Sequence, residues 1–377
     1  MSKEVRAIVE SVSGLDQVGR VLVVAEQRLQ EGNAPFVADL GVVLVERYGP
    51  FAREMRLVLA AMVRWLAVVD DPVHLEQALR LLEIPGVAQG NVTRSAASRM
   101  AARRPAADLA PVFSRAAGRG GVLDELCACL THELVIRGED VDDLPEFRSW
   151  ATSTRWAHHP LKWLPLHRLP VEERAEFRRY DPRGGTSLPM PHGPLDRPGT
   201  TRSLVSGPAP VSVETTTSAA AAAIGRAVGN WAEASNGKIE ARTFTLSPPT
   251  RSLANVLPAL DLDCLRSAGS APPVSLARCS PADAWAMLFA AASSGGAYGG
   301  GRYGAYGRLE AWQSMAGLCG APKTAAFTDV EEQVGAHQWF TFAASTEWFF
   351  QEFMDIGIAA QSTDGRSLAV LAATDTD

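Results

Sequence analysis

Glycine, tyrosine and arginine residues are interleaved between residues 293 and 319 more closely than elsewhere in this 377-residue chain. Five glycines lie within residues 295–301. A glycine run visits positive φ at little steric cost, so successive backbone N–H groups can converge on one point, and such a concave nest suits an anion. Arg302 and Arg308 follow and would add charge-assisted hydrogen bonds. The stretch therefore predicts a site for a phosphorylated or carboxylate ligand.

A helix is expected directly after this glycine run. Aromatic and apolar residues recur at every third position from Tyr303 to Met315, which fits one face of a helix that begins near Gly304. The positive end of its dipole would point back at the glycines. The predicted ligand-binding residues are Gly295, Gly296, Tyr298, Gly300, Arg302, Tyr303, Tyr306 and Arg308.

The same pattern has a structural interpretation. Glycines also let two helices turn sharply and pack closely, and the Tyr and Trp stripe would then belong to the core. The run is not a Walker loop, because no Gly-Lys-Ser/Thr follows it. It is not a dinucleotide fingerprint either, because residues 281–292 before it have the pattern of a helix instead of a strand. Both interpretations stay open at this point.

Signatures of catalysis and metal binding are weak elsewhere. Cys319, His337 and Asp355 could form a nucleophile, a base and an orienting carboxylate, but any domain of this size offers such a set by chance. The adjacent His158 and His159 have no partner at helical spacing that would complete a ligand set. We therefore predict no catalytic residue, no metal and no cofactor, and the sequence leaves open whether the chain is an enzyme.

Composition indicates a cytoplasmic globular protein. The chain is 46% hydrophobic and 21% charged, with a net charge of −6. That acidic balance argues against a general nucleic-acid-binding role, which rests on many basic contacts to phosphate. The five cysteines are scattered and form no C-x-x-C pair, which favours free thiols over a disulfide framework. We see no signal peptide and no apolar run of 18 residues, so no membrane association is expected.

Glycine and proline punctuation predicts a multi-domain chain. Residues 1–160 have helical periodicity broken by glycine and proline every few turns, which predicts an all-α, irregular stack of helix pairs similar to a helical repeat. Residues 161–210 are rich in proline and glycine and predict a linker. Residues 211–377 predict an α+β domain with a largely antiparallel sheet.

Within this last domain the expected elements alternate. Helices are predicted at 215–234, 281–292, 328–336 and 345–354, with a helix or broken helix at 253–266. Strands are predicted at 238–246, 273–279, 338–342, 356–361 and 367–373, and Thr363-Asp364-Gly365 has the composition of a hairpin turn.

Two basic stretches precede the linker. The first contains Arg94, Arg99, Arg103, Arg104, Arg115 and Arg119. The second runs from Arg155 to Arg183 with three tryptophans nearby, and several glutamates dilute its charge. Such stretches can contact a phosphate backbone or an acidic protein, but solvated helix faces are their ordinary explanation.

Three blocks near the C-terminal end, GGAYGGGRYGAYGRLEAW, STEWFFQEFMDIGIAA and DGRSLAVLAATDTD, carry a resemblance. Together they resemble an uncharacterised family of actinobacterial proteins over roughly residues 238–377. The resemblance implies one C-terminal module, and it brings no activity to transfer to this chain.

The sequence therefore favours a non-enzymatic cytoplasmic interaction protein. Its helical scaffold would bind a protein partner, and the α+β domain would supply a second recognition surface; an immunity or conflict-system component is one such role. The alternative is an enzyme or sensor that binds a small anionic ligand at the glycine run. Nucleic-acid binding through the basic stretches is a weaker third hypothesis.

Overall fold

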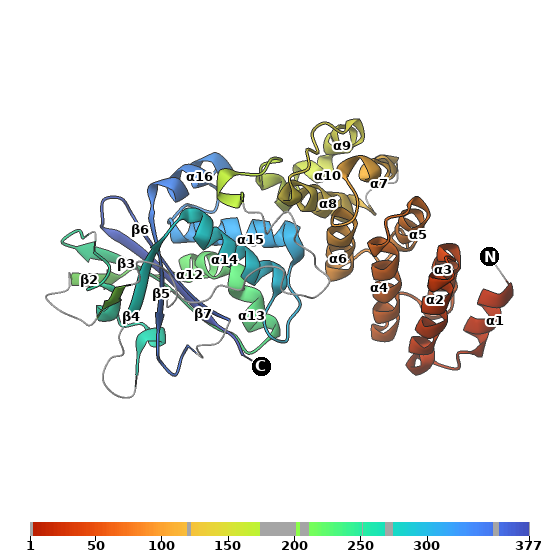
Figure 1. The fold of residues 1–377 in the computed structure, drawn as a ribbon, viewed down its shortest axis with the longest axis horizontal. Helices are drawn as coiled ribbons and strands as arrows, with labels where there is room; N and C mark the ends of the chain where they lie inside the picture. Colours follow the sequence, from red (N-terminus) through yellow and green to blue (C-terminus); the bar gives the residue numbers. More distant parts are fainter. Residues whose placement is uncertain are drawn as a thin grey trace. The chain divides into compact units, whose positions relative to one another are not determined.

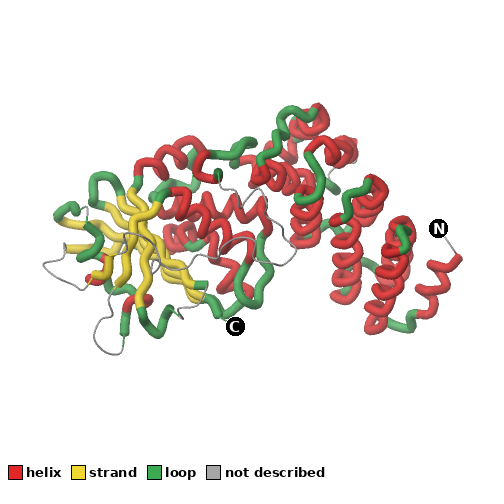
Figure 2. The backbone as a smooth tube through the Cα atoms, in the orientation of Figure 1, coloured by secondary structure: helices red, strands yellow, loops and turns green. Residues whose placement is uncertain are grey.

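The computed structural model describes residues 3–118, 122–173, 201–203, 211–250, 252–267, 274–349 and 354–376. Two compact units make up the chain. Of the described residues, those up to Lys162 belong to the first unit and those from Trp163 onward belong to the second. The first unit is helical and the second combines helices with an antiparallel sheet, which confirms the predicted fold class (Figures 1 and 2).

The helices of the first unit begin and end close to the predicted glycine and proline breaks. Asn33 and Asp71 cap two of them by accepting the N–H of the residue three positions later. Proline follows each cap within the first turn, where its missing N–H costs nothing. The helices are α1 (Lys3–Ser11), α2 (Val21–Gln30), α3 (Ala34–Tyr48), α4 (Arg53–Val68), α5 (Pro72–Leu82), α6 (Gly90–Ala101), α7 (Ala106–Gly118), α8 (Asp124–Arg137), α9 (Pro145–Ala151) and α10 (Thr154–Ala157).

Two rows of helices form the first part of this unit. Helices α2, α4, α6 and α8 pack on one another in succession, as do α1, α3 and α5, and neighbours in sequence pack across the rows. This is the arrangement of an α-solenoid, in which each helix pair buries its apolar face against the next pair. Residues 126–136 of α8 are all buried, and Glu133 among them is held by Ser98 and Arg137.

Within the described residues of the second unit, seven strands form one sheet in the order β1-β4-β5-β6-β7-β3-β2, and every neighbouring pair is antiparallel. The strands are β1 (Thr201–Ser203), β2 (Val211–Glu214), β3 (Lys238–Ser247), β4 (Val274–Cys279), β5 (Gln338–Ala344), β6 (Asp355–Gln361) and β7 (Ser367–Thr374). The predicted turn at Thr363-Asp364-Gly365 joins β6 to β7, and Gly365 has φ +70°.

Both faces of the sheet are covered. One face, with Phe244, Leu246 and Val370, packs against residues 253–265, which form two short 3-10 turns instead of a long helix. The helices lie on the other face, where α12, α14 and α15 contact β3, β5 and β7 (Figure 1). They are α12 (Ser218–Ile224), α13 (Gly229–Ala234), α14 (Pro281–Ser294), α15 (Tyr303–Leu318) and α16 (Phe327–Ala336).

Two of the predicted helices are wrong in detail. The helix expected at 215–234 is split into α12 and α13, because the Ala227 N–H donates to Ser314 Oγ (2.8 Å) instead of continuing the helical ladder. The helix expected at 345–354 is absent over residues 345–349, where the Thr346 side chain donates to Cys264 O (2.9 Å). Residues 350–353 lie outside the described residues.

The predicted linker, residues 161–210, is described only in part. Trp163 belongs to the second unit, where its indole N–H donates to Ala325 O (3.2 Å) and its ring packs on Phe327. Residues 201–203 form β1, and residues 174–200 and 204–210 lie outside the described residues. No helix among the described residues is long and apolar enough to cross a membrane.

Candidate functional site

The glycine-rich run is the connection between α14 and α15. The capping box of Ser280 and Asp283 starts α14, and the helix ends at Gly295, whose φ is +86°. The Arg302 N–H then returns to donate to Ala292 O (2.8 Å), so the run begins and ends at the last turn of α14. The loop therefore reverses the chain within a few residues and delivers it directly into α15.

Close backbone approach explains the glycines. A Cβ on Gly301 would collide with the carbonyl group of Ser293, and one on Gly307 would lie 2.8 Å from the Ser293 Cβ. A Cβ on Gly299 would lie 2.8 Å from the Cβ of Ala234 in α13. A real Cβ essentially never lies this close to another heavy atom. Only glycine therefore lets α14, α15 and α13 meet here. These distances favour the structural interpretation of the run.

Side chains of the protein itself already accept hydrogen bonds from two of the loop amides. The Ala297 N–H donates to Asp375 Oδ2 (2.7 Å), and the Tyr298 N–H donates to Ser235 Oγ (3.1 Å). Asp375 is only 1% exposed, and a Cβ on Gly296 would overlap its carboxylate. The nest thus holds an anion, as its chemistry predicts, but the anion is a side chain of this protein.

The two arginines of the predicted site are also engaged. Arg302 Nη2 lies 2.7 Å from Glu233, and its Nε lies 3.7 Å from Glu310. Arg308 is fully buried and forms a two-pronged contact with the Glu172 carboxylate, at 2.7 and 2.9 Å. Within the described residues, the Arg302 guanidinium at the loop surface therefore already lies close to two carboxylates, which disfavours an added anion.

The predicted tyrosines do not share one buried face with the rest of the stripe. Tyr298 is 64% exposed, and Tyr303 adopts φ +60°, an uncommon conformation for a residue other than glycine. Helix α15 is buried on most of its circumference, and Tyr306 lies on its partly exposed side. Gly300 is exposed. A small anionic ligand stays a prediction, and neither the charges nor the packing of the loop favour it.

The described arginines of the first basic stretch are largely engaged within the first unit. Residues 174–183 of the second stretch lie outside the described residues. Arg104 is buried and donates to the carbonyls of Ala67 and Val69, and Arg115 pairs with Glu76 and Glu83. Arg94 Nε lies 4.0 Å from Glu125, and Arg119 lies outside the described residues. Helix contacts within the first unit therefore account for much of this charge.

A basic surface on α4 went unnoticed in the sequence. Arg53, Arg56 and Arg64 are exposed, and within the described part of the chain none of them forms an ion pair or side-chain hydrogen bond. Leu57 lies between them and is 62% exposed. We call Arg53, Arg56, Leu57 and Arg64 the α4 surface. The signal was available, because these residues fall on the face opposite the apolar stripe of that helix.

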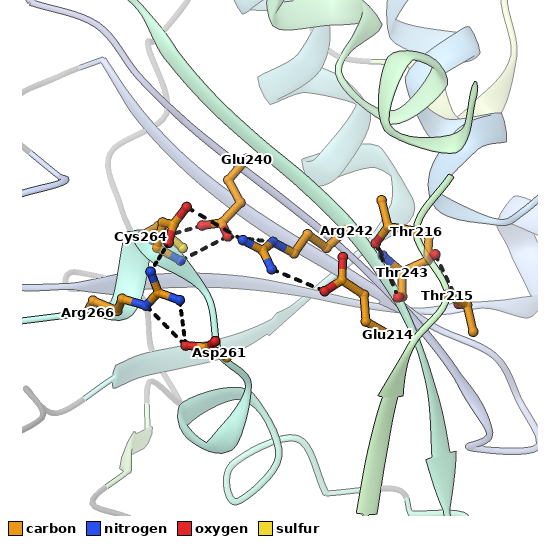
Figure 3. A network of polar contacts seen from close by, with 10 residues as sticks. Glu214, Thr215, Thr216, Glu240, Arg242, Thr243, Asp261, Cys264 and Arg266 are labelled. Atoms are coloured by element: carbon orange, nitrogen blue, oxygen red, sulfur yellow. Dashed lines mark hydrogen bonds and ion pairs between the residues drawn. The ribbon is translucent and has the colours of Figure 1, made fainter. Parts of the chain in front are cut away.

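A polar network lies on the sheet face that packs against residues 253–265. Glu240 on β3 accepts the N–H groups of Asp263 (2.9 Å) and Cys264 (2.8 Å) and pairs with Arg242 (2.8 Å). Arg242 also lies 3.2 Å from Glu214 on β2 (Figure 3). The network fastens residues 261–266 to the sheet.

Substitution of Glu240 by Gln should loosen this fastening. A glutamine has one acceptor oxygen where the carboxylate has two, so one backbone N–H of the Asp263–Leu265 turn loses its partner, a loss of roughly 1–1.5 kcal/mol. The Cys264 thiol, which burial holds at a raised pKa, should then react about 10-fold faster with iodoacetamide. Mass spectrometry measures the rate, and the buried Cys127 and Cys129 of the first unit serve as internal controls. Equal acceleration at all three thiols would mean global unfolding instead.

Cys319, His337 and Asp355 each have surroundings that differ from those of a nucleophile, a base and an orienting carboxylate. Burial raises the pKa of Cys319 to about 12, so its thiolate is scarce at neutral pH. His337 contacts Gln333 O, and the Asp355 carboxylate accepts the Thr374 hydroxyl. No group of three or more His, Cys, Asp or Glu side chains in the described ranges is arranged to hold a metal ion.

Comparison with known protein families gives a match over most of the chain. The model of a family of unknown function, DUF6183, matches residues 19–377, so the similarity extends through the helical unit as well as the C-terminal blocks. No curated protein and no solved structure matches the chain significantly.

Proposed function

Since the chain belongs to DUF6183, a family of unknown function, its role must be argued from its own surface, and we propose a non-enzymatic cytoplasmic interaction protein. Its helical unit binds an acidic segment of a protein partner. The α4 surface carries this proposal, because it combines uncompensated positive charge with an exposed apolar side chain.

The positive charges of the α4 surface do not stabilise the fold. Like charges at helical spacing destabilise a helix by a few tenths of a kcal/mol. Arg53 and Arg64 lie on one face about 16 Å apart, at roughly 1.5 Å per residue. Glu54 is the acidic residue of this helix, and it lies on a neighbouring face. The surface is therefore ready to pair with carboxylates from outside the unit.

Leu57 favours a protein over a nucleic acid. It lies between Arg53 and Arg64, where a phosphate backbone would offer it only charge. A protein segment with acidic residues around an apolar one would satisfy all three positions. Arginine is enriched among the residues that dominate the binding energy of protein interfaces. The net charge of −6 also disfavours general association with nucleic acid.

Site-specific photo-cross-linking tests the proposal. The full chain carries a benzophenone amino acid in place of Leu57 and is irradiated in extract of its source cells treated with nuclease. We expect an adduct whose partner peptide, identified by mass spectrometry, is acidic. In the Arg53→Glu/Arg64→Glu background its yield should fall about 10-fold, equivalent to about 1.4 kcal/mol of binding.

The matched control is Arg6→Glu/Arg148→Glu, which makes the same charge change at two other exposed arginines of this unit. The adduct should survive there. Equal loss in both backgrounds, an adduct that nuclease removes, or no adduct at all would each overturn the proposal.

A further inference from the structure

Strand β2 lies at one end of the sheet. It pairs with β3 on one side, and within the described residues no strand pairs with its outer edge. An edge of this kind presents a row of N–H and C=O groups to which another strand can be added.

The register shows which backbone groups face outward. Thr215 N–H donates to Thr243 O (2.8 Å), and Val213 is opposite Thr245. In an antiparallel pair, residues two positions apart have the same orientation, so Val211 and Val213 direct their backbone groups to β3. Ser212 and Glu214 therefore direct their N–H and C=O groups away from the sheet.

The two faces of β2 differ in chemistry. Val211 and Val213 project on the same face and are 67% and 59% exposed. Glu214 projects on the opposite face, beside the network of Figure 3. That network contains four carboxylates, from Glu214, Glu240, Asp261 and Asp263, against the two guanidinium groups of Arg242 and Arg266, so this face is acidic.

Natural edge strands are commonly protected by proline, lysine or an inward-pointing charge. The sequence Val-Ser-Val-Glu of β2 contains neither proline nor lysine, and Arg242 lies 3.2 Å from its one charged side chain. Its shortness limits the number of hydrogen bonds that an added strand can make. Within the described residues the edge is therefore open to pairing, but the short strand makes the pairing weak.

We propose that the outer edge of β2 binds an extended peptide segment of a partner in which apolar residues alternate with lysine or arginine. Its backbone bonds to Ser212 and Glu214, its apolar side chains cover Val211 and Val213, and its basic side chains approach Glu214. This surface lies in a different unit from the α4 surface and binds a partner of opposite charge, so the two proposals stand or fall separately.

A labelled nonapeptide of alternating valine and lysine serves as the probe, and fluorescence anisotropy with the full chain measures its binding. We expect this peptide to bind saturably. A control peptide with glutamate in place of each lysine should bind at least 10-fold more weakly. Two further peptides carry N-methyl groups on alternate amides. One is methylated at the odd-numbered residues and the other at the even-numbered residues. Because only alternate amides of an added strand face β2, one of these two patterns should abolish binding and the other should retain it. Equal binding of both methylated peptides would overturn the proposal.

A proline substitution isolates the outward N–H. Ser212→Pro removes a donor that does not bond to β3, a position where edge strands tolerate proline, whereas Ser212→Ala keeps it. Peptide binding should fall at least 10-fold in Ser212→Pro and stay unchanged in Ser212→Ala, with the same thermal midpoint in both. Retained binding in Ser212→Pro contradicts the proposal. So does a dimer of the full chain that Ser212→Pro dissociates, because the edge would then pair with a second copy.

Discussion

Replacing Arg308 by Ala should destabilise the second unit by about 3–5 kcal/mol, because it leaves the buried Glu172 carboxylate without its counter-ion. Arg308 is fully buried, and it also donates to Pro165 O and His167 O, both at 2.9 Å. Glu172 in turn accepts the Trp312 indole N–H (2.7 Å). Hydrogen exchange in urea, read on the peptides of α15, would measure the loss in this unit alone.

Arg266→Ala is the matched control. Arg266 also pairs with carboxylates of the second unit, Asp261 and Asp263, but its side chain is 59% exposed. Exposed pairs contribute about 0–1 kcal/mol, so this variant should unfold almost as the parent does. Replacing both Arg308 and Glu172 by Met should recover part of the loss, since no charge is then buried alone. Equal losses for Arg308→Ala and Arg266→Ala would refute the buried-pair account.

Gly301→Ala should cost roughly 1–3 kcal/mol or more, the range for forcing extra volume into a packed interior. The new methyl group would overlap the Ser293 carbonyl and lie 2.5 Å from the Ser294 carbonyl carbon. These are backbone atoms in the last turn of α14, so no side chain can rotate away to make room. Denaturant unfolding of the second unit, again followed by hydrogen exchange, would measure the cost.

Gly335→Ala controls for the change of residue type. A Cβ at Gly335 meets nothing within 4 Å, and the residue lies inside α16. Alanine should stabilise that helix by about 0.5–1 kcal/mol, since glycine is the poorer helix former. If Gly301→Ala folded with unchanged stability, close packing of α14 on α15 would not be the reason for the glycines, and the ligand interpretation would gain ground.

The predictions that succeeded rest on residues close together in the chain. The Ser280 and Asp283 capping box and the Thr363-Asp364-Gly365 turn act within a few positions, so the start of α14 and the β6–β7 hairpin could be predicted. The fold class followed from the same local patterns. The helix expected at 345–354 is absent over residues 345–349, where Thr346 bonds to a residue 82 positions away.

The candidate site was harder to predict because its partners are remote. Arg308 meets a carboxylate 136 positions earlier, and Ala297 meets one 78 positions later. A glycine run followed by arginines has the same local sequence whether its anion is a ligand or the protein's own side chain. Only the α4 surface could have been found from the sequence, as three arginines on the face of a helix opposite its apolar stripe.

The Glu172–Arg308 pair also determines where a fragment that contains the second unit must begin if it is to fold. Residues 163–173 lie in the predicted linker, yet they supply the counter-ion of a buried arginine in α15. A fragment that starts at Val211, where the proline-rich sequence ends, would lack Glu172 and leave that arginine without its counter-ion. A fragment that starts before Trp163 keeps both. The ability to express this half of the protein in isolation therefore depends on a short stretch that, from its composition, looks dispensable.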